Sequence, residues 1–256
     1  MDLLLSLMSA DELQIASDYS FRWLDLKNPL AGSLGCPDAI VASDFLEVAE
    51  RLHNRSQLTF SVAIGELLSG TTKLNSDGAD TIGQFQLPLP VEVLKRFDYV
   101  KVALAGSQTN ESWQGLAESL SLQLGNPSKL ILVHYADNHL ANAIDWKSTL
   151  AASRSLGCEY VLIDTFDKKA GQLLDWLSIE DCQRYATEAE TIGLKLSLAG
   201  SLQIDDFKTL EKTGASILGI RGAACLDGSR VSRLCRDRLQ RLSSCFASQK
   251  LAIELG

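Results

Sequence analysis

The chain has 256 residues, 46% of them hydrophobic and 22% charged, and 24 Lys+Arg against 32 Asp+Glu give a formal net charge of −8. This composition excludes disordered, collagen-like and coiled-coil proteins, and the length is enough to bury a large core. A sequence pI near 5.0 argues against a nucleic-acid partner, because binding to a phosphate backbone needs a basic face.

The sequence also predicts that the protein has no membrane partner. Apolar runs such as Leu130 to Val133 are far shorter than the roughly 18 residues of a membrane helix. Met1 to Met8 lacks a basic region and a cleavage site, so we interpret it as a strand. The six cysteines form no C-x-x-C pair and have no histidine nearby, which predicts free thiols, no metal site and a cytoplasmic location. The oligomeric state is left open, a homo-oligomer included.

Short runs rich in strand-forming residues recur along the chain. Most are continuously apolar, as is typical of parallel strands covered on both faces. The eight predicted strands are Leu3 to Leu7, Phe21 to Leu26, Leu58 to Ile64, Tyr99 to Leu104, Leu130 to His134, Tyr160 to Asp164, Leu194 to Ala199 and Ile217 to Ile220.

Amphipathic stretches between these runs predict helices. Ser9 and Ser178 are typical N-caps, and Gly193 and Gly214 are typical helix stops. The helices we expect begin at Ser9 and span Asp38 to Leu52, Ser178 to Ile192, Gln203 to Lys212 and Val231 to Phe246.

Eight strand–helix units in about 250 residues are typical of a (β/α)8 TIM barrel. A doubly wound open sheet has the same alternation, but no G-x-G-x-x-G motif follows the first strand. The Gly- and Ser-rich stretch from Ser69 to Gly78 indicates a mobile loop rather than a linker. We therefore predict one catalytic barrel domain spanning residues 1–256.

Ionisable residues interrupt the apolar pattern of the second and fourth strands. Asp25 and Lys27 are two positions apart, so both side chains project from the same face, which we expect to be the barrel interior. Burial lowers the pKa of a lysine toward the range in which the neutral amine attacks a carbonyl. Lys101 lies inside the fourth strand, and a second cation nearby has the same effect. The alternative is a structural Asp–Lys pair.

The fifth and sixth strands end in further ionisable residues. Asp164 ends the sixth strand, and Lys168 follows four residues later, in a loop that is expected to fold over the barrel mouth. His134 ends the fifth strand, and either a proton carrier or a structural histidine fits that position.

Small residues follow the last two strands, where this fold commonly binds phosphate. Gly200 and Ser201 follow the seventh strand, and Arg221, Gly222 and Ala223 follow the eighth. Backbone N–H groups beside small residues approach an anion closely, and Arg221 adds a positive charge. The alternative is that the glycines serve as turn residues only.

Lysines and carboxylates beside a phosphate site favour carbonyl chemistry through a lysine Schiff base on a small phosphorylated aldehyde or ketone. A class I aldolase-like enzyme and a non-catalytic barrel that binds a phosphorylated ligand remain open.

The chain resembles the (5-formylfuran-3-yl)methyl phosphate synthase family in five segments that occur in order. It differs from that family at His134, in the loop Ser69 to Gly78, and in part at Asp227 to Arg233. The five segments are Asp25-Leu26-Lys27-Asn28-Pro29-Leu30-Ala31-Gly32-Ser33-Leu34-Gly35, the Lys101 strand ending in Leu104-Ala105-Gly106, Asp164-Thr165 with Lys168 and Gly171, Leu198-Ala199-Gly200-Ser201, and Arg221-Gly222-Ala223-Ala224-Cys225.

The resemblance implies a TIM-barrel lyase without an organic cofactor. Such an enzyme condenses two molecules of glyceraldehyde 3-phosphate, with loss of phosphate and water, into the furan precursor of methanofuran. By the same resemblance, Lys27 is the Schiff-base residue and Lys101 the proton acceptor, while Asp25, Asp164 and Lys168 support them.

Overall fold

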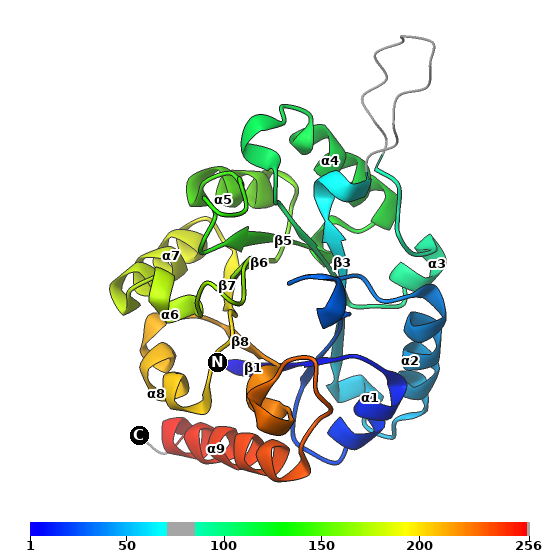
Figure 1. Ribbon diagram of the computed structural model, residues 1–256, viewed down its shortest axis with the longest axis vertical. Coiled ribbons are helices and arrows are strands. Elements are labelled where there is room, and N and C mark those ends of the chain that lie inside the picture. Colours follow the sequence, from blue (N-terminus) through cyan, green and yellow to red (C-terminus); the bar gives the residue numbers. More distant parts are fainter. Residues whose placement is uncertain (71–84, 255–256) are drawn as a thin grey trace.

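Eight parallel strands close into a barrel within the residues that the structure describes, 1–70 and 85–254 (Figure 1). In this computed structural model each strand pairs with its sequence neighbour, and β8 pairs with β1 to close the ring. All eight predicted strands are confirmed, and the closed ring excludes the doubly wound sheet. The strands are β1 (Asp2–Leu7), β2 (Trp23–Leu26), β3 (Thr59–Glu66), β4 (Tyr99–Ala103), β5 (Leu130–Tyr135), β6 (Tyr160–Asp164), β7 (Lys195–Leu198) and β8 (Ile217–Ile220).

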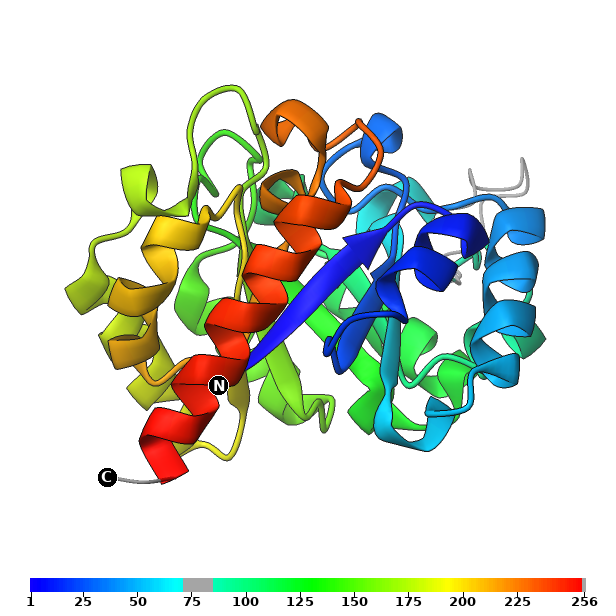
Figure 2. The same cartoon turned by 90° about the horizontal axis from the view of Figure 1, so that it is seen from below.

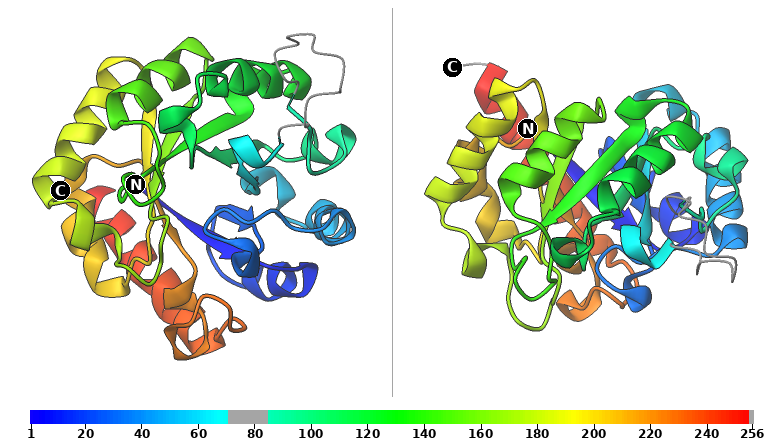
Figure 3. Two further views of the ribbon diagram at one scale, coloured as in Figure 1. Left: turned by 45° about the horizontal axis from the view of Figure 1, so that its top comes forward. Right: turned by 90° about the horizontal axis from the view of Figure 1, so that it is seen from above.

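The helices surround this ring, and the views in Figures 1 and 3 place them outside the strands on all sides. The last helix, α9, lies outside the barrel between α8 and α1 (Figures 1 and 2). The helices are α1 (Ala10–Ala16), α2 (Ala39–Arg51), α3 (Val91–Leu94), α4 (Trp113–Leu124), α5 (Trp146–Ser155), α6 (Leu173–Trp176), α7 (Ile179–Thr191), α8 (Phe207–Leu210) and α9 (Arg236–Glu254).

The residues that we expect to cap and to end the helix between β6 and β7 do so in the structure. Ser178 caps α7, because its hydroxyl accepts a hydrogen bond from the backbone N–H of Asp181 at 3.0 Å. Gly193 follows the end of α7 with φ +79°, a left-handed conformation that glycine adopts without strain. The predicted helix Gln203 to Lys212 is split into α8 and the short 3-10 helices that flank it.

The predicted start of the last helix is wrong, because α9 begins at Arg236 rather than Val231. The backbone of the preceding segment is engaged elsewhere. The carbonyls of Arg230 and Ser232 accept hydrogen bonds from the Arg221 guanidinium, and the Arg233 carbonyl accepts one from the N–H of Leu226. These carbonyls are therefore not available to the first turn of a helix.

Side chains alternate between two buried layers along each strand. Leu24 and Leu26 of β2 pack outward against the helices, whereas Trp23 packs inside the barrel. The Trp23 ring stacks on Tyr99 with a centroid distance of 5.2 Å and meets the edge of Tyr160 at 5.3 Å. These three rings begin β2, β4 and β6, so they close the N-terminal end of the barrel and leave its C-terminal end for polar groups.

Some predictions are outside what the structure tests. The loop Ser69 to Gly78 lies for the most part outside the described residues, and that residues 1–256 form one catalytic domain stays a prediction. No helix in residues 1–70 and 85–254 is long and apolar enough to span a bilayer. All six cysteines are free thiols, as predicted, and a cytoplasmic location stays a prediction.

Candidate active site

A cavity of about 580 Å³ opens at the C-terminal ends of the strands. Lys27, Lys101, Asp164 and Lys168 all line it, together with the loops after β2, β6, β7 and β8. A second cavity of the same volume lies near the start of β1, beside α1, and no lysine lines it among the described residues. The first cavity is therefore the candidate active site, at the end of the barrel where this fold performs chemistry.

The lower level of the site is an ion pair between strands β2 and β4. Lys101 Nζ lies 2.6 Å from Asp25 Oδ2, and both side chains are almost fully buried. The Asp25 carboxylate also accepts hydrogen bonds from Ser61 Oγ at 2.7 Å and Ser6 Oγ at 3.1 Å. Three donors on three different strands thus hold this carboxylate, and a buried charge needs such partners.

Lys27 lies just above this pair, one residue beyond the end of β2. As expected from the alternation, its side chain lines the cavity, and the residue is only 9% exposed. Among the described residues its ammonium makes no hydrogen bond or ion pair. The pKa of Lys27 is lowered to about 7. Burial is the largest cause and the Lys101 ammonium adds to it, while Asp164 and Asp25 partly offset both effects.

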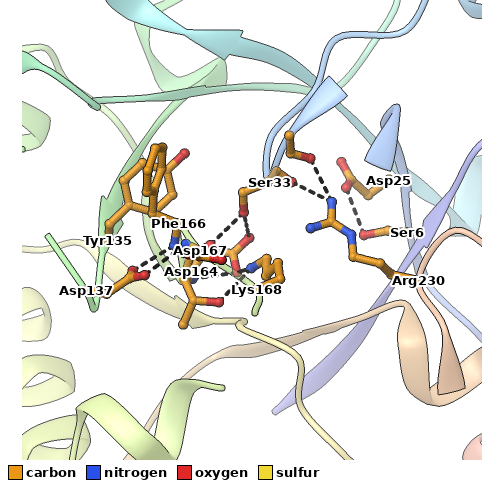
Figure 4. A network of polar contacts seen from close by, with 12 residues as sticks. Ser6, Asp25, Ser33, Tyr135, Asp137, Asp164, Phe166, Asp167, Lys168 and Arg230 are labelled. Carbon is orange, nitrogen blue, oxygen red and sulfur yellow. Dashed lines mark hydrogen bonds and ion pairs between the residues drawn. The ribbon is translucent and has the colours of Figure 1, made fainter. Parts of the chain in front are cut away.

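Asp164 and Lys168 form a second ion pair at the end of β6 (Figure 4). Lys168 Nζ also donates to Thr165 Oγ1 at 2.9 Å. Burial alone raises the pKa of Asp164, but the ammonium groups of Lys168 and Lys27 outweigh it and hold that pKa below its usual value. Burial lowers the pKa of Lys168, and Asp164 offsets part of that effect.

Other buried polar groups position these residues, and the sequence did not single them out. Ser33 Oγ, in the loop after β2, donates to the Thr165 carbonyl at 2.7 Å and lies 3.3 Å from Asp164 Oδ2. Asp137 accepts hydrogen bonds from the backbone N–H groups of Phe166 at 2.7 Å and Asp167 at 2.9 Å, and so fixes the loop that carries Lys168 (Figure 4). Alternation gives an available signal for Ser6 and Ser61, which are polar residues at inward strand positions.

The loop after β2 depends on a close backbone approach. The N–H of Asn28 donates to the Gly35 carbonyl at 2.8 Å, which closes the loop on itself. A Cβ atom on Gly35 would lie 2.1 Å from the Asn28 carbonyl oxygen, so a larger residue does not fit there. This tight closure holds Ser33 over the barrel mouth.

Backbone donors after β7 and β8 face the same cavity. Gly200, Ser201 and Gly222 line it, whereas Ala223, also predicted to bind phosphate, is not among its lining residues. The N–H groups of all four have no acceptor in residues 1–70 and 85–254. Ser201 has φ +56°, an uncommon left-handed conformation for a residue with a side chain. Backbone N–H groups without an acceptor are the kind of donor that binds an anion such as phosphate, and the role of these residues stays a prediction.

Arg221 also lines that cavity, but its guanidinium has no N–H donor left to bind a ligand there. Its guanidinium pairs with Glu12, with Nη1 at 2.8 Å from Oε2. It also donates hydrogen bonds to the carbonyls of Ser6, Arg230 and Ser232. All five N–H donors are thereby used inside the protein. The predicted contribution of Arg221 to phosphate binding is untested, and these contacts favour an indirect one.

His134 lies outside the site. Its ring packs between β5 and α5, where Nδ1 is 3.3 Å from Thr149 Oγ1 and the Trp146 ring is 5.7 Å away between centroids. Burial lowers the pKa of His134 to about 4. Of the two alternatives for this residue, the contacts favour a structural histidine.

Among the described residues, no three or more His, Cys, Asp or Glu side chains gather in a metal-binding arrangement. That the protein uses neither a metal nor an organic cofactor stays a prediction. The fold and site define a class: a (β/α)8 barrel whose C-terminal mouth holds buried lysines and carboxylates beside free backbone donors.

A family model described as 4-HFC-P synthase matches residues 3–243, and the chain belongs to this family. The (5-formylfuran-3-yl)methyl phosphate synthase of Methanobrevibacter smithii is 31% identical over 212 residues, which cover 81% of this chain and 82% of that relative. The protein of the same name from Methanopyrus kandleri is 29% identical over 244 residues, which cover 93% and 95% of the two chains. These relatives are named synthases, so the family is one of enzymes, and the resemblance found in the sequence is confirmed.

Solved structures agree on the fold. Phosphoribosyl anthranilate isomerase from Thermus thermophilus superposes with a TM-score of 0.59 at 10% identity and covers 97% of this chain and 100% of its own. Thiamine phosphate pyrophosphorylase from Pyrococcus furiosus gives 0.53 at 12% identity and covers 95% of each chain. At such identities the likeness shows the barrel fold alone.

Proposed function

We propose that this protein is a (5-formylfuran-3-yl)methyl phosphate synthase that condenses two molecules of glyceraldehyde 3-phosphate through an imine on Lys27, with loss of phosphate and water. In this proposal it is a lyase acting on phosphates and serves the biosynthesis of methanofuran or a methanofuran-like cofactor. Membership of the 4-HFC-P synthase family supports the product, and the contacts of the buried lysines support the mechanism.

One observation carries the mechanism. Four lysines line the cavity, and Lys169 is exposed. The two buried carboxylates beside the other three lysines, Asp25 and Asp164, pair with only two of them. Asp25 pairs with Lys101 and Asp164 pairs with Lys168, which leaves Lys27 without an ion pair of its own among the described residues. A lysine with a pKa of about 7 is substantially neutral near neutral pH, and the neutral amine is the nucleophile. Lys27 is therefore the residue that attacks the aldehyde carbon of the first substrate molecule.

Lys101 is well placed to move protons for this reaction. Its ammonium lines the same cavity below Lys27, and it donates a proton to the hydroxyl that leaves the carbinolamine as water. The neutral Lys101 amine then accepts the proton alpha to the imine, which gives the enamine that attacks the second aldehyde. Asp25 stabilises the ammonium each time it re-forms.

Phosphate binding falls to the loops after β7 and β8. One substrate phosphate binds to free backbone N–H groups, those of Gly200, Ser201, Gly222 and Ala223. These donors are uncharged, so they bind the phosphate by hydrogen bonds and leave the net charge of the protein at −8. Lys168 and Asp164 line the same cavity at the end of the neighbouring strand β6, where Lys168 balances the carboxylate and faces the substrate.

The direct test is to incubate the protein with glyceraldehyde 3-phosphate and to follow released phosphate together with the absorbance of the furan aldehyde. We expect both to appear together in a ratio of one to one. A class I aldolase releases neither phosphate nor a furan, and a barrel that only binds its ligand shows a raised melting temperature without turnover. Either of these results contradicts the proposal.

A further inference from the structure

Two arginines of the segment that follows β8 have opposite hydrogen-bonding states. Every N–H donor of Arg221 is used by the protein, as described above. The sequence did not single out Arg230. Only its Nη2 atom makes hydrogen bonds: it donates to the Gly32 carbonyl at 2.7 Å and lies 3.5 Å from the Ser33 carbonyl. Among the described residues, the Nε and Nη1 atoms of Arg230 have no hydrogen-bond acceptor.

The Arg230 side chain lies at the mouth of the candidate active site. It lines the cavity together with Lys168, and Figure 4 shows it reaching from the segment after β8 toward Ser33 in the loop after β2. The side chain is half-buried, and burial lowers the pKa of Arg230 while the Asp164 carboxylate partly offsets that effect. A half-buried guanidinium with unused donors has the geometry that recognises a phosphate or carboxylate.

The backbone that carries Arg230 is fixed from several sides. Cys225 and Leu234 form an antiparallel bridge, and the Leu226 N–H donates a hydrogen bond to the Arg233 carbonyl. Gly222 packs so closely that a Cβ atom there would lie 2.8 Å from the Gly228 carbonyl oxygen. The buried Arg221 guanidinium holds the Arg230 carbonyl itself. Arg221 is therefore a positioning residue that presents Arg230 to the cavity.

The proposed reaction requires two phosphate groups in one cavity, because each substrate molecule brings one and only one is lost. The free N–H groups after β7 and β8 account for the first. The Arg230 guanidinium donates to the Gly32 carbonyl in the loop after β2. It therefore reaches from the segment after β8, across β1, to the loop that follows Lys27. In a protein with a net charge of −8, a second phosphate needs a local cation of this kind.

We propose that Arg230 binds the phosphate group of the second substrate molecule, the one whose aldehyde is attacked by the enamine formed on Lys27. This inference rests on the proposed function and adds a second phosphate subsite to it. It predicts that loss of Arg230 leaves the first molecule's imine unaffected and weakens only the condensation.

The test compares Arg230→Met with Arg233→Met, which removes an exposed arginine from the same segment. Imine formation is measured as the fraction of Lys27 trapped by borohydride at rising glyceraldehyde 3-phosphate, and condensation as phosphate release over the same range. Because charged hydrogen bonds are lost, we expect Arg230→Met to raise the half-saturating concentration for release by about tenfold or more. Its trapping curve and both curves of Arg233→Met should match the wild type, and Arg230→Lys should restore part of the loss.

Two results overturn the inference: release curves of Arg230→Met and Arg233→Met that coincide, or a shift of trapping equal to that of release. If the wild type releases no phosphate, the proposed function has failed, and the subsite is judged with inorganic phosphate instead. Phosphate should then raise the melting temperature of the wild type and of Arg233→Met more than that of Arg230→Met. Equal shifts in all three proteins overturn the subsite as well.

Discussion

Two levels of the same barrel interior hold a buried lysine in opposite electrostatic states. In the lower level, Lys101 pairs with Asp25 at 2.6 Å, and Ser6 and Ser61 support that carboxylate. In the upper level, Lys27 is buried and makes no ion pair among the described residues, and its pKa falls to about 7. Burial is similar in both, so the paired carboxylate and not the depth distinguishes Lys101 from the lysine that we propose as the nucleophile.

The comparison is sharpened most by removing the lower lysine. Lys101→Met takes away the group that we expect to move protons, so phosphate release should fall by about 10²–10⁴-fold. Lys27 should still form the imine at equilibrium, because water can supply the proton that loss of the carbinolamine hydroxyl requires, and borohydride trapping after long incubation measures it. Trapping is carried out near pH 9, where the Lys27 amine is neutral even if the loss of the neighbouring Lys101 charge raises its pKa. Loss of trapping in a folded Lys101→Met protein would show that the two levels do not act separately.

The lower pair is also expected to be a large element of stability. Asp25→Asn leaves the Lys101 ammonium buried without its counter-ion, which should lower the free energy of unfolding by about 3–5 kcal/mol. The double variant Asp25→Asn/Lys101→Met removes both charges and should recover most of that loss. Denaturant unfolding measures all three proteins, with Asp44→Asn on the exposed face of α2 as the control. A double variant as unstable as the single one would contradict the account.

The upper level predicts an effect on stability that depends on pH. Because the pKa of Lys27 is lowered from 10.5 to about 7 on folding, the unfolded chain binds one more proton between those pH values. The free energy of unfolding of the wild type, relative to Lys27→Met, should therefore be level below pH 7 and rise by about 1.4 kcal/mol per pH unit above it. A difference between the two proteins that is constant from pH 7 to 10 would show that Lys27 is an ordinary lysine.

Much of the fold and part of the site follow from the sequence for physical reasons. Strands in this barrel are apolar on both faces, so a single charged residue such as Lys101 stands out within one. The period of two then places Asp25 and Lys27 on the same inward face. Family resemblance adds roles for these residues, which local patterns do not supply.

Other features depend on contacts between distant parts of the chain. Ser33 meets Asp164 and Thr165 across more than a hundred residues, and nothing local distinguishes it from other loop serines. Arg221 and Arg230 lie in one short segment and are the same residue type. The donors of Arg221 are all bonded to Glu12 and to carbonyl groups, whereas Arg230 keeps free donors. Only the folded arrangement separates their roles, and it also explains why α9 begins late.

The central claim is that Lys27 forms the imine, and the most direct measurement locates the trapped adduct. The protein is incubated with glyceraldehyde 3-phosphate near pH 8, reduced with borohydride, digested and sequenced by mass spectrometry, with the exposed-lysine variant Lys208→Met as a control for non-specific modification. The account predicts one dominant adduct, on Lys27, in the wild type and in Lys208→Met, and none at that position in Lys27→Met. An adduct on Lys101 beside an unmodified Lys27 would contradict it.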